Sequence, residues 1–296
     1  MSSVYTLQSN NRTKTFVIIT LFILLTTLVG YVAALYFNNY SFALIAFAVS
    51  LIQSSVAYFW GDKVALASTG AREVSFEEAP QIHTLVENLS KIADIPKPKV
   101  YISPDPAANA FACGRDPKHA SICLNQGILD LLDKNELEGV IAHELSHVKN
   151  RDTLVMTITM VLTSVISFIV DNIFRFSFFG FGGRDDRESN RSPWIYVLYI
   201  VVIIAAPLLA LIMQLAISRS REYLADATAV TFTRYPDGLI SALEKLYSQK
   251  IPSAYQSTAM SSLYIAPPKK SKGAFMQNLF STHPTIEERV SKLRGE

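Results

Sequence analysis

Charged residues are scarce in this chain. They make up 18 % of its 296 residues, and the formal net charge is only +2. The sequence also contains no run of basic residues long enough to indicate binding to nucleic acid, which requires an extended positive surface. We therefore expect no nucleic-acid partner.

Four long stretches lack charge altogether, and half of all residues are hydrophobic. About 20 apolar residues cross a bilayer, and each stretch reaches or nearly reaches that length. The sequence therefore predicts four transmembrane helices, with a core helix of a soluble protein as the alternative for each. The absence of charge argues against a transporter, whose spans carry charged residues near the bilayer midplane. The stretches are Phe16 to Phe37, Ser41 to Trp60, Thr153 to Val170 and Trp194 to Ile217.

The order of these stretches divides the chain into four parts. Residues 1–60 form a transmembrane hairpin, and residues 153–217 form a second transmembrane pair with a polar loop at 175–193. Residues 61–152 and 218–296 are the soluble parts, and an even number of spans places both of them, with both termini, on one side.

Basic residues concentrate on the cytoplasmic side of membrane proteins. Eight lie near the span ends on the side of the soluble parts, against four in the 175–193 loop, so we expect that side to be the cytoplasm, at the inner (plasma) membrane. The eight are Arg12, Lys14, Lys63, Arg72, Lys149, Arg151, Arg219 and Arg221.

Cysteine is limited to Cys113 and Cys123. The residues between them, Arg115 to Ala120, read as a hairpin turn, so the two side chains can face each other across two strands. In the cytoplasm we expect both to be thiols. We do not expect either to bind a metal.

Histidine is also rare, yet two of the five histidines lie in the pentad His143-Glu-Leu-Ser-His147. On a helix, His143 and His147 sit one turn apart on one face, where both imidazoles can approach one Zn²⁺. Glu144 is rotated by about 100° from His143, which directs it toward a water held by the metal, as a base requires. The pentad is the zinc-protease pattern H-E-x-x-H. A chance match on a surface helix and a purely structural metal site are the alternatives.

A catalytic zinc usually has three protein ligands, and the best candidate for the third is Glu222. Asp226 lies four residues further on, hence on the same helical face. It can accept a hydrogen bond from the free ring nitrogen of a zinc histidine, which fixes the tautomer. Alternatively, both carboxylates are ordinary helix charges paired with Arg219 or Arg221.

Taken together, these motifs resemble the HtpX family of bacterial and archaeal membrane zinc metalloproteases, relatives of the CAAX prenyl protease. The resemblance implies that His143, His147 and Glu222 bind one Zn²⁺ per chain, that Glu144 is the base, and that Asp226 supports the site. Cys113 departs from the family pattern, which often has Thr or a similar small residue there. The matching stretches are Asn109 to Gly114, Glu138 to Asp152, Ser218 to Asp226 and Ser281 to Thr285.

Two further site predictions concern the substrate. The segment Asn109, Ala110, Phe111 and Ala112 reads as an edge strand to which an extended peptide can add through main-chain hydrogen bonds; the alternative is a plain hairpin strand. His283 can donate a hydrogen bond to a developing oxyanion; the alternative is a residue that only precedes a helix start.

The expected fold is a mainly α membrane protein with four transmembrane helices and a cytoplasmic α+β zincin-like domain that contains a small β-hairpin or sheet. We expect hydrolysis of peptide bonds in membrane-protein or peptide substrates at the cytoplasmic face, and the resemblance implies membrane-protein quality control. One alternative is a CAAX-type prenyl protease, although four spans are few for it. Another is a non-catalytic, metal-stabilised membrane scaffold, although no fourth ligand is evident. The sequence predicts no particular oligomeric state.

In the soluble parts we expect helices at 77–93, 129–132, 237–247 and 286–293, and strands at 99–103, 109–114 and 121–124.

Overall fold

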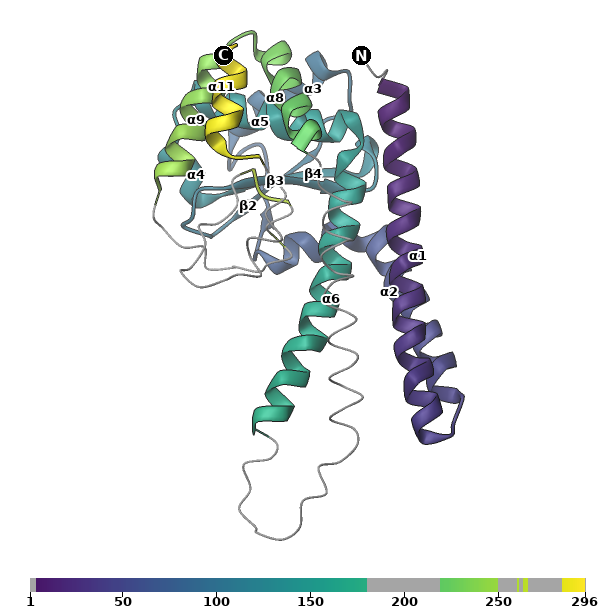
Figure 1. Ribbon diagram of the computed structural model, residues 1–296. Helices are drawn as coiled ribbons and strands as arrows, with labels where there is room; N and C mark the ends of the chain where they lie inside the picture. Colours follow the sequence, from purple (N-terminus) through teal and green to yellow (C-terminus); the bar gives the residue numbers. More distant parts are fainter. Residues whose placement is uncertain (1–3, 180–218, 250–259, 261–262, 266–283, 296) are drawn as a thin grey trace.

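The computed structural model describes residues 4–179, 219–249, 260, 263–265 and 284–295. Within these residues a soluble part lies at one end of a group of long helices (Figure 1). The beginning of the first helix and the end of the last one lie at the soluble end. This arrangement matches the expectation that both termini are on the side of the soluble parts.

Two helices form the predicted N-terminal hairpin. Helix α1 spans Val4–Phe37 and helix α2 spans Ser41–Ser68, and they pack against each other along their length. Thr13–Leu35 of α1 and Ser41–Ser68 are both long and apolar enough to cross a membrane. Large apolar side chains such as Leu24 and Leu44 are exposed on them, which is unfavourable in water and is expected for helices that face lipid.

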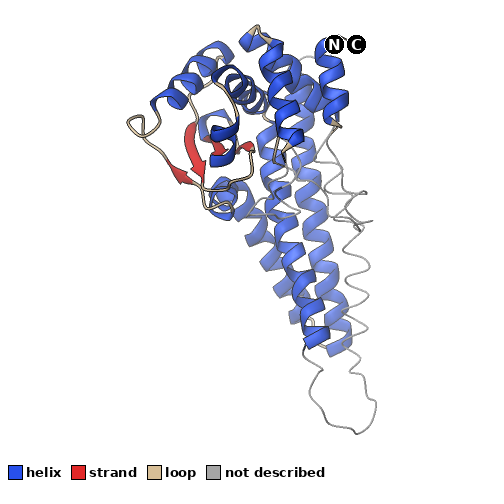
Figure 2. Ribbon diagram, turned by 90° about the vertical axis from the view of Figure 1, so that its left-hand side faces the viewer, coloured by secondary structure: helices blue, strands red, loops and turns tan. Residues whose placement is uncertain are grey.

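Helix α6 spans Asp152–Phe179 and carries the third predicted span. It packs beside α1 and α2, so the three helices extend together away from the soluble part (Figures 1 and 2). Within it, Asp152–Val165 is an apolar helical stretch. The fourth predicted span, 194–217, and most of the 175–193 loop lie outside the described residues.

A four-stranded sheet lies at the centre of the soluble part (Figure 1). Its order is β1-β2-β4-β3, so β3 is an edge strand. The β3–β4 pair is antiparallel, as the predicted hairpin requires, whereas β2 and β4 are parallel. The strands are β1 at Arg72–Glu73, β2 at Lys99–Ser103, β3 at Ala110–Gly114 and β4 at Ala120–Asn125.

The side chains of the hairpin alternate between two apolar cores. Ala110 and Ile122 face the core beneath the soluble helices. Phe111, Cys113 and Cys123 face a second core that α1, α2 and α6 complete. This period of two makes the sheet the junction between the soluble part and the long helices.

The register also places the two thiols. Cys113 pairs with Ser121, and Cys123 pairs with Phe111, so the cysteines are diagonal neighbours and not directly opposite each other. Both are free and buried, and burial raises the pKa of each thiol, that of Cys123 to about 12. Both are therefore protonated at neutral pH.

The remaining helices cover the soluble face of the sheet. Helix α5 at Lys134–Asn150 is central, with α3, α8 and α9 packed against it. The predicted helices occur within a few residues of their expected bounds, and Thr285 and Glu288 form a capping box at the start of the last one. Their bounds are α3 Pro80–Ala93, η1 Pro117–His119, α4 Gln126–Leu131, α8 Arg219–Thr233, α9 Pro236–Ser248 and α11 Ile286–Arg294.

Candidate metal centre

Helix α5 carries the pentad. The Asp133 side chain accepts hydrogen bonds from two backbone N–H groups of the first turn, and the Glu136 carboxylate accepts one from the Asp133 N–H. The helix ends at Arg151, which has a left-handed φ of 60°. Between these ends the spacing of four residues puts His143 and His147 on one face, and both side chains are buried.

Helix α8 brings Glu222 to this face of α5. The Nε2 atoms of His143 and His147 lie 3.2 Å apart. The two carboxylate oxygens of Glu222 lie 3.7 and 3.8 Å from these nitrogens. Two nitrogens bound to one tetrahedral Zn²⁺ at ~2.0–2.1 Å are separated by roughly 3.3–3.4 Å. The donor set and its spacing therefore fit a zinc ion with little movement.

Two buried aspartates hold the outer nitrogens of the histidines. Asp226 lies 2.9 Å from Nδ1 of His143, and Asp152 lies 3.1 Å from Nδ1 of His147. A proton on each Nδ1 leaves each Nε2 lone pair free to bind a metal. Asp152 also accepts a 2.7 Å hydrogen bond from Nδ2 of Asn11, which joins helix α1 to the site.

Arg289 on α11 completes the support of Asp226. Its Nε and Nη2 donate to the two carboxylate oxygens of Asp226 at 2.8 and 2.6 Å, a bidentate pair. Its Nη1 donates to the Ile265 carbonyl at 3.0 Å and lies 3.9 Å from Glu222. Arg289 is fully buried, so its charge is balanced by these carboxylates and not by water.

Glu144 lies between the centre and strand β3. It is buried, and burial raises the pKa of its carboxyl to about 7. The Ala112 N–H donates a hydrogen bond to this carboxylate. A proton acceptor with a pKa near neutrality therefore lies beside the edge strand that was predicted to bind substrate.

The electrostatics of the site favour a cation. Burial lowers the pKa of His147, but the hydrogen bond to Asp152 and the charge of Glu222 outweigh it and raise the pKa to about 9. Burial and the charge of Arg289 lower the pKa of His143. A proton and a metal compete for the same ring nitrogen, so metal binding must displace the proton of His147.

Most predicted site residues meet at this centre. His143, Glu144, His147, Glu222 and Asp226 are together, and β3 contacts α5. Asn109 precedes β3, and Ala110 to Ala112 lie within it.

Two other residues were named from the sequence, His283 as a donor to the oxyanion and Arg221 as an alternative partner of the two carboxylates. His283 lies outside the described residues. Arg221 is buried 3.8 Å from Asp152, and its Nη atoms have no hydrogen-bond partner among the described residues.

Sequence reasoning missed Asp152, Arg289 and Asn11. The position of Asp152 was in principle detectable, because it follows the end of the pentad helix after a single residue and can fold back onto it. Arg289 lies 146 residues from His143 and Asn11 lies 141 residues from Asp152. No local pattern marks either, since only tertiary packing brings them to the site.

Several known proteins are similar to this chain. The sequence model of peptidase family M48 matches residues 77–296. A protein of Caldanaerobacter subterraneus subsp. tengcongensis named "Protease HtpX homolog" is 41 % identical over 99 % of this chain and 98 % of its own length. A protein of Thermoanaerobacter pseudethanolicus with the same name is 42 % identical over the same shares.

One solved structure shares the fold. The crystal structure of Ste24p from S. mikatae aligns with a TM-score of 0.50 and 19 % identity. The alignment covers 91 % of this chain but only 62 % of that one. The chain thus corresponds to about three fifths of the length of that protein.

Proposed function

The chain belongs to peptidase family M48 and to the HtpX relatives within it, and from this premise we propose that His143, His147 and Glu222 bind one Zn²⁺ while Glu144 acts as the base. The protein is a membrane metalloprotease, a hydrolase of peptide bonds. The observation that supports the ligand set is the convergence of these three buried side chains, whose donor atoms all lie within 4.8 Å of one another.

In this proposal each residue of the centre has a distinct role in peptide hydrolysis. Zinc, when bound, lowers the pKa of a water to ~7 and polarises the scissile carbonyl. Glu144 accepts the proton of the attacking water and then delivers it to the leaving amine. Asp226 and Asp152 keep the histidine protons on Nδ1, and Arg289 holds Asp226 in place. Burial of all these groups excludes bulk water and strengthens their interactions.

Strand β3 would bind the substrate backbone. In the described residues the Ala112 N–H is bonded to Glu144. A substrate carbonyl that takes this N–H releases the carboxylate for proton transfer. Substrate binding and activation of the base are coupled in this proposal through one backbone group. His283 remains a candidate donor to the oxyanion.

The bilayer supplies the substrates in this proposal. Helix α6 begins at Asp152, five residues after His147, and a helix rises about 1.5 Å per residue. The centre would then lie one or two turns beyond the membrane face. We propose that the chain has four transmembrane spans and that its soluble part lies on the cytoplasmic side of the inner membrane. At that face it would cleave membrane proteins, as part of membrane-protein quality control.

Glu144→Gln and Glu222→Ala test the two roles separately. In Glu144→Gln we expect zinc to remain near one equivalent per chain while proteolysis of a membrane-protein substrate is lost. In Glu222→Ala we expect most of the zinc to be lost. Metal analysis and gel-based cleavage on the purified proteins provide the readouts.

Two outcomes would reject these assignments. Retained cleavage in Glu144→Gln would show that another group is the base. Full zinc occupancy in Glu222→Ala would exclude Glu222 as a ligand. If the zinc-loaded wild-type protein cleaves no unlipidated substrate, the prenyl-protease and scaffold alternatives are favoured instead. Cleavage of a prenylated peptide would then distinguish the prenyl protease from the scaffold.

A further inference from the structure

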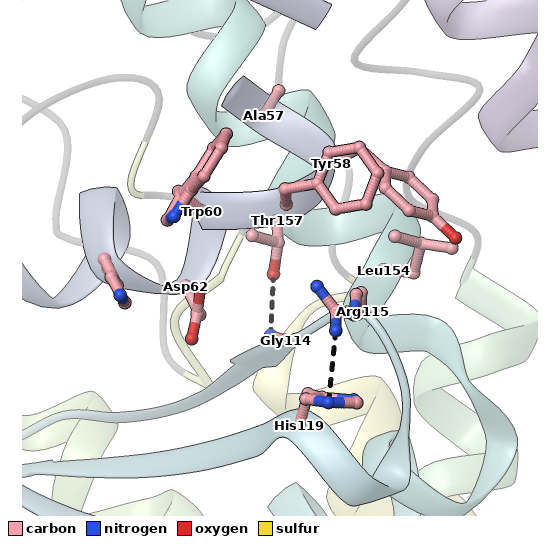
Figure 3. Close-up of a pocket in the computed structure, with 11 residues that line it drawn as sticks. Ala57, Tyr58, Trp60, Asp62, Gly114, Arg115, His119, Leu154 and Thr157 are labelled. Atoms are coloured by element: carbon pink, nitrogen blue, oxygen red, sulfur yellow. Dashed lines mark hydrogen bonds between the residues drawn. The ribbon is translucent and has the colours of Figure 1, made fainter. Parts of the chain in front are cut away.

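A cavity of about 270 Å³ lies outside the metal centre, where α2, α6 and the β3–β4 turn meet. Helix α2 supplies three consecutive aromatic residues, Tyr58 to Trp60, and α6 supplies Thr157. Gly114 and Arg115 of the turn form the opposite wall (Figure 3). The peptidase function proposed above does not use this cavity.

The cavity is continuous with the substrate strand. Along β3, alternate residues direct their backbone groups away from β4, and Ala110, Ala112 and Gly114 form this outer row. The Ala112 N–H bonds to Glu144, and the Gly114 N–H bonds to Oγ1 of Thr157 at 3.2 Å. Because a strand rises ~3.3 Å per residue, the cavity begins about two residues along β3 from the base.

The other end of β3 is covered by the chain itself. The Ile265 N–H donates to the Ala110 carbonyl at 3.2 Å. The ring of Tyr264 packs edge-on against Phe111, with ring centroids 5.9 Å apart, and Tyr264 is buried. A substrate that adds to β3 therefore finds the Ala110 carbonyl occupied, and Thr157 holds the Gly114 N–H at the other end. Its backbone must therefore pair with β3 at Ala112, and the chain continues past Gly114 toward the cavity.

The cavity walls select for an aromatic side chain. Tyr58, Phe59 and Trp60 provide ring surfaces, and the guanidinium of Arg115 lies 5.8 Å from the Phe59 ring centroid. Aromatic rings pack favourably against both kinds of group. Asp62, Lys63 and Arg115 leave the lining with one net positive charge. The Asp116 carboxylate, 3.7 Å from Nε of Arg115, offsets it, so the cavity does not select a strongly charged ligand.

The size and location of the cavity favour a peptide over a lipid. Its 270 Å³ is just below the ~300–1,000 Å³ typical of sites for drug-sized ligands, and it therefore suits one large side chain. Tyr58 and Trp60 are exposed on α2 just before its first charged residues, Asp62 and Lys63, and aromatic residues mark the bilayer interface. A segment that leaves the bilayer beside α2 reaches the cavity first and β3 next.

We propose that this cavity is a specificity subsite that binds an aromatic side chain of the substrate, two to four residues from the scissile bond. This inference rests on the proposed peptidase function. The substrate would then contact Ala112, Gly114 and the aromatic residues Tyr58 to Trp60 of α2, and not the whole predicted segment 109–112. It also assigns a role in substrate selection to a membrane helix.

Peptide cleavage tests the preference. One peptide series shares a cleavable sequence, and each position within four residues of the scissile bond is varied among Phe, Leu, Ala and Lys. For the wild-type full chain in detergent, kcat/KM should be roughly tenfold or more higher with Phe than with Ala at one position. Trp60→Ala, which removes a wall, and Leu154→Trp, which narrows the space, should abolish this ratio by lowering kcat/KM for the Phe peptide.

Phe76→Ala is the matched control, because Phe76 is an exposed aromatic residue that does not line the cavity. It should retain the wild-type ratio. A wild type that cleaves without aromatic preference at any position, or a Trp60→Ala protein that keeps the preference, would overturn the subsite. A wild type that cleaves no peptide would count against the proposed function instead.

Photo-crosslinking decides the occupant independently of turnover. Trp60 is replaced by benzoyl-phenylalanine in the Glu144→Gln full chain in lipid nanodiscs, with the same replacement at Phe76 as control. Irradiation with the best peptide should give a peptide adduct at position 60 but not at position 76, with the cross-link at the aromatic residue. Adducts only with lipid, or no peptide adduct at position 60, would reject the proposal.

Discussion

At the scale of single residues, the most informative groups are the two aspartates behind the histidines. Asp226 and Asp152 each hold one Nδ1 and come from different helices. Burial raises the pKa of Asp226, but the charge of Arg289 and the hydrogen bond to His143 outweigh it and lower the pKa well below its usual range. Asp226 is therefore ionised at every physiological pH and can orient His143 continuously.

Neutralising either aspartate should weaken metal binding without abolishing the fold. We expect Asp226→Asn and Asp152→Asn to lower zinc affinity by roughly 10–100-fold, as loss of such supporting groups does at other metal sites. Competition with a chromogenic zinc chelator measures this change. Asp237→Asn, an exposed residue in the first turn of α9, is the control and should bind zinc like the wild type. Unchanged affinity in both site variants would contradict the orienting role.

At the scale of elements, helix α5 is held at its N-terminus by more than its own capping box. Glu136 is buried there and accepts hydrogen bonds from Ser241 and Lys245 of α9 at 2.6 and 2.7 Å. The pentad helix is thereby locked to α9.

Most of the helix and strand predictions succeeded because apolar periodicity and capping are local signals. The β1 strand and the parallel β2–β4 pairing were not predicted, because strand order depends on contacts between distant segments.

The bonds to Glu136 should make stability depend on pH. Burial raises the pKa of Glu136, but the hydrogen bonds from Lys245, Ser241 and the Asp133 N–H outweigh it and lower the pKa below its ordinary value. Its ionised form therefore stabilises the folded state above the unfolded pKa of about 4.3, and this stabilisation is lost as pH falls through the lower folded pKa.

Glu136→Gln should consequently cost on the order of 1 kcal/mol at pH 7. That corresponds to a melting temperature lower by a few degrees in detergent, and the difference from wild type should shrink at pH 4 and below. Glu244→Gln is the control, since Glu244 pairs with Arg294 at an exposed site. A pH-independent difference for Glu136→Gln would show that its charge is not involved.

At the scale of the whole molecule, the candidate centre joins parts that are far apart in the chain. Its groups come from α5, α6, α8 and α11, and Asn11 of α1 reaches Asp152. A metal ion bound there would cross-link the two soluble parts. Because unfolding separates these ligands, metal binding would add directly to the stability of the folded chain.

Removal of the metal should therefore lower the stability of the whole protein. With free zinc at 100 times the dissociation constant, the expected stabilisation is about 2.7 kcal/mol. Chelation should lower the melting temperature of the wild type, and added zinc should restore it. In Glu222→Ala, both treatments should have much smaller effects. Equal responses of the two proteins would place the stabilising metal elsewhere.

The sequence alone determined the peptidase family and named the residues of the candidate centre: the pentad, the downstream carboxylates and the apolar stretches are local patterns from which physical rules predict ligands, a base and membrane helices. Only the tertiary structure decided what surrounds that chemistry. It brought Arg289 and Asn11 to the site, covered the Ala110 end of β3 with Ile265, and opened a cavity beside Gly114. These features depend on long-range packing, and packing leaves no periodic or motif-like trace in the sequence.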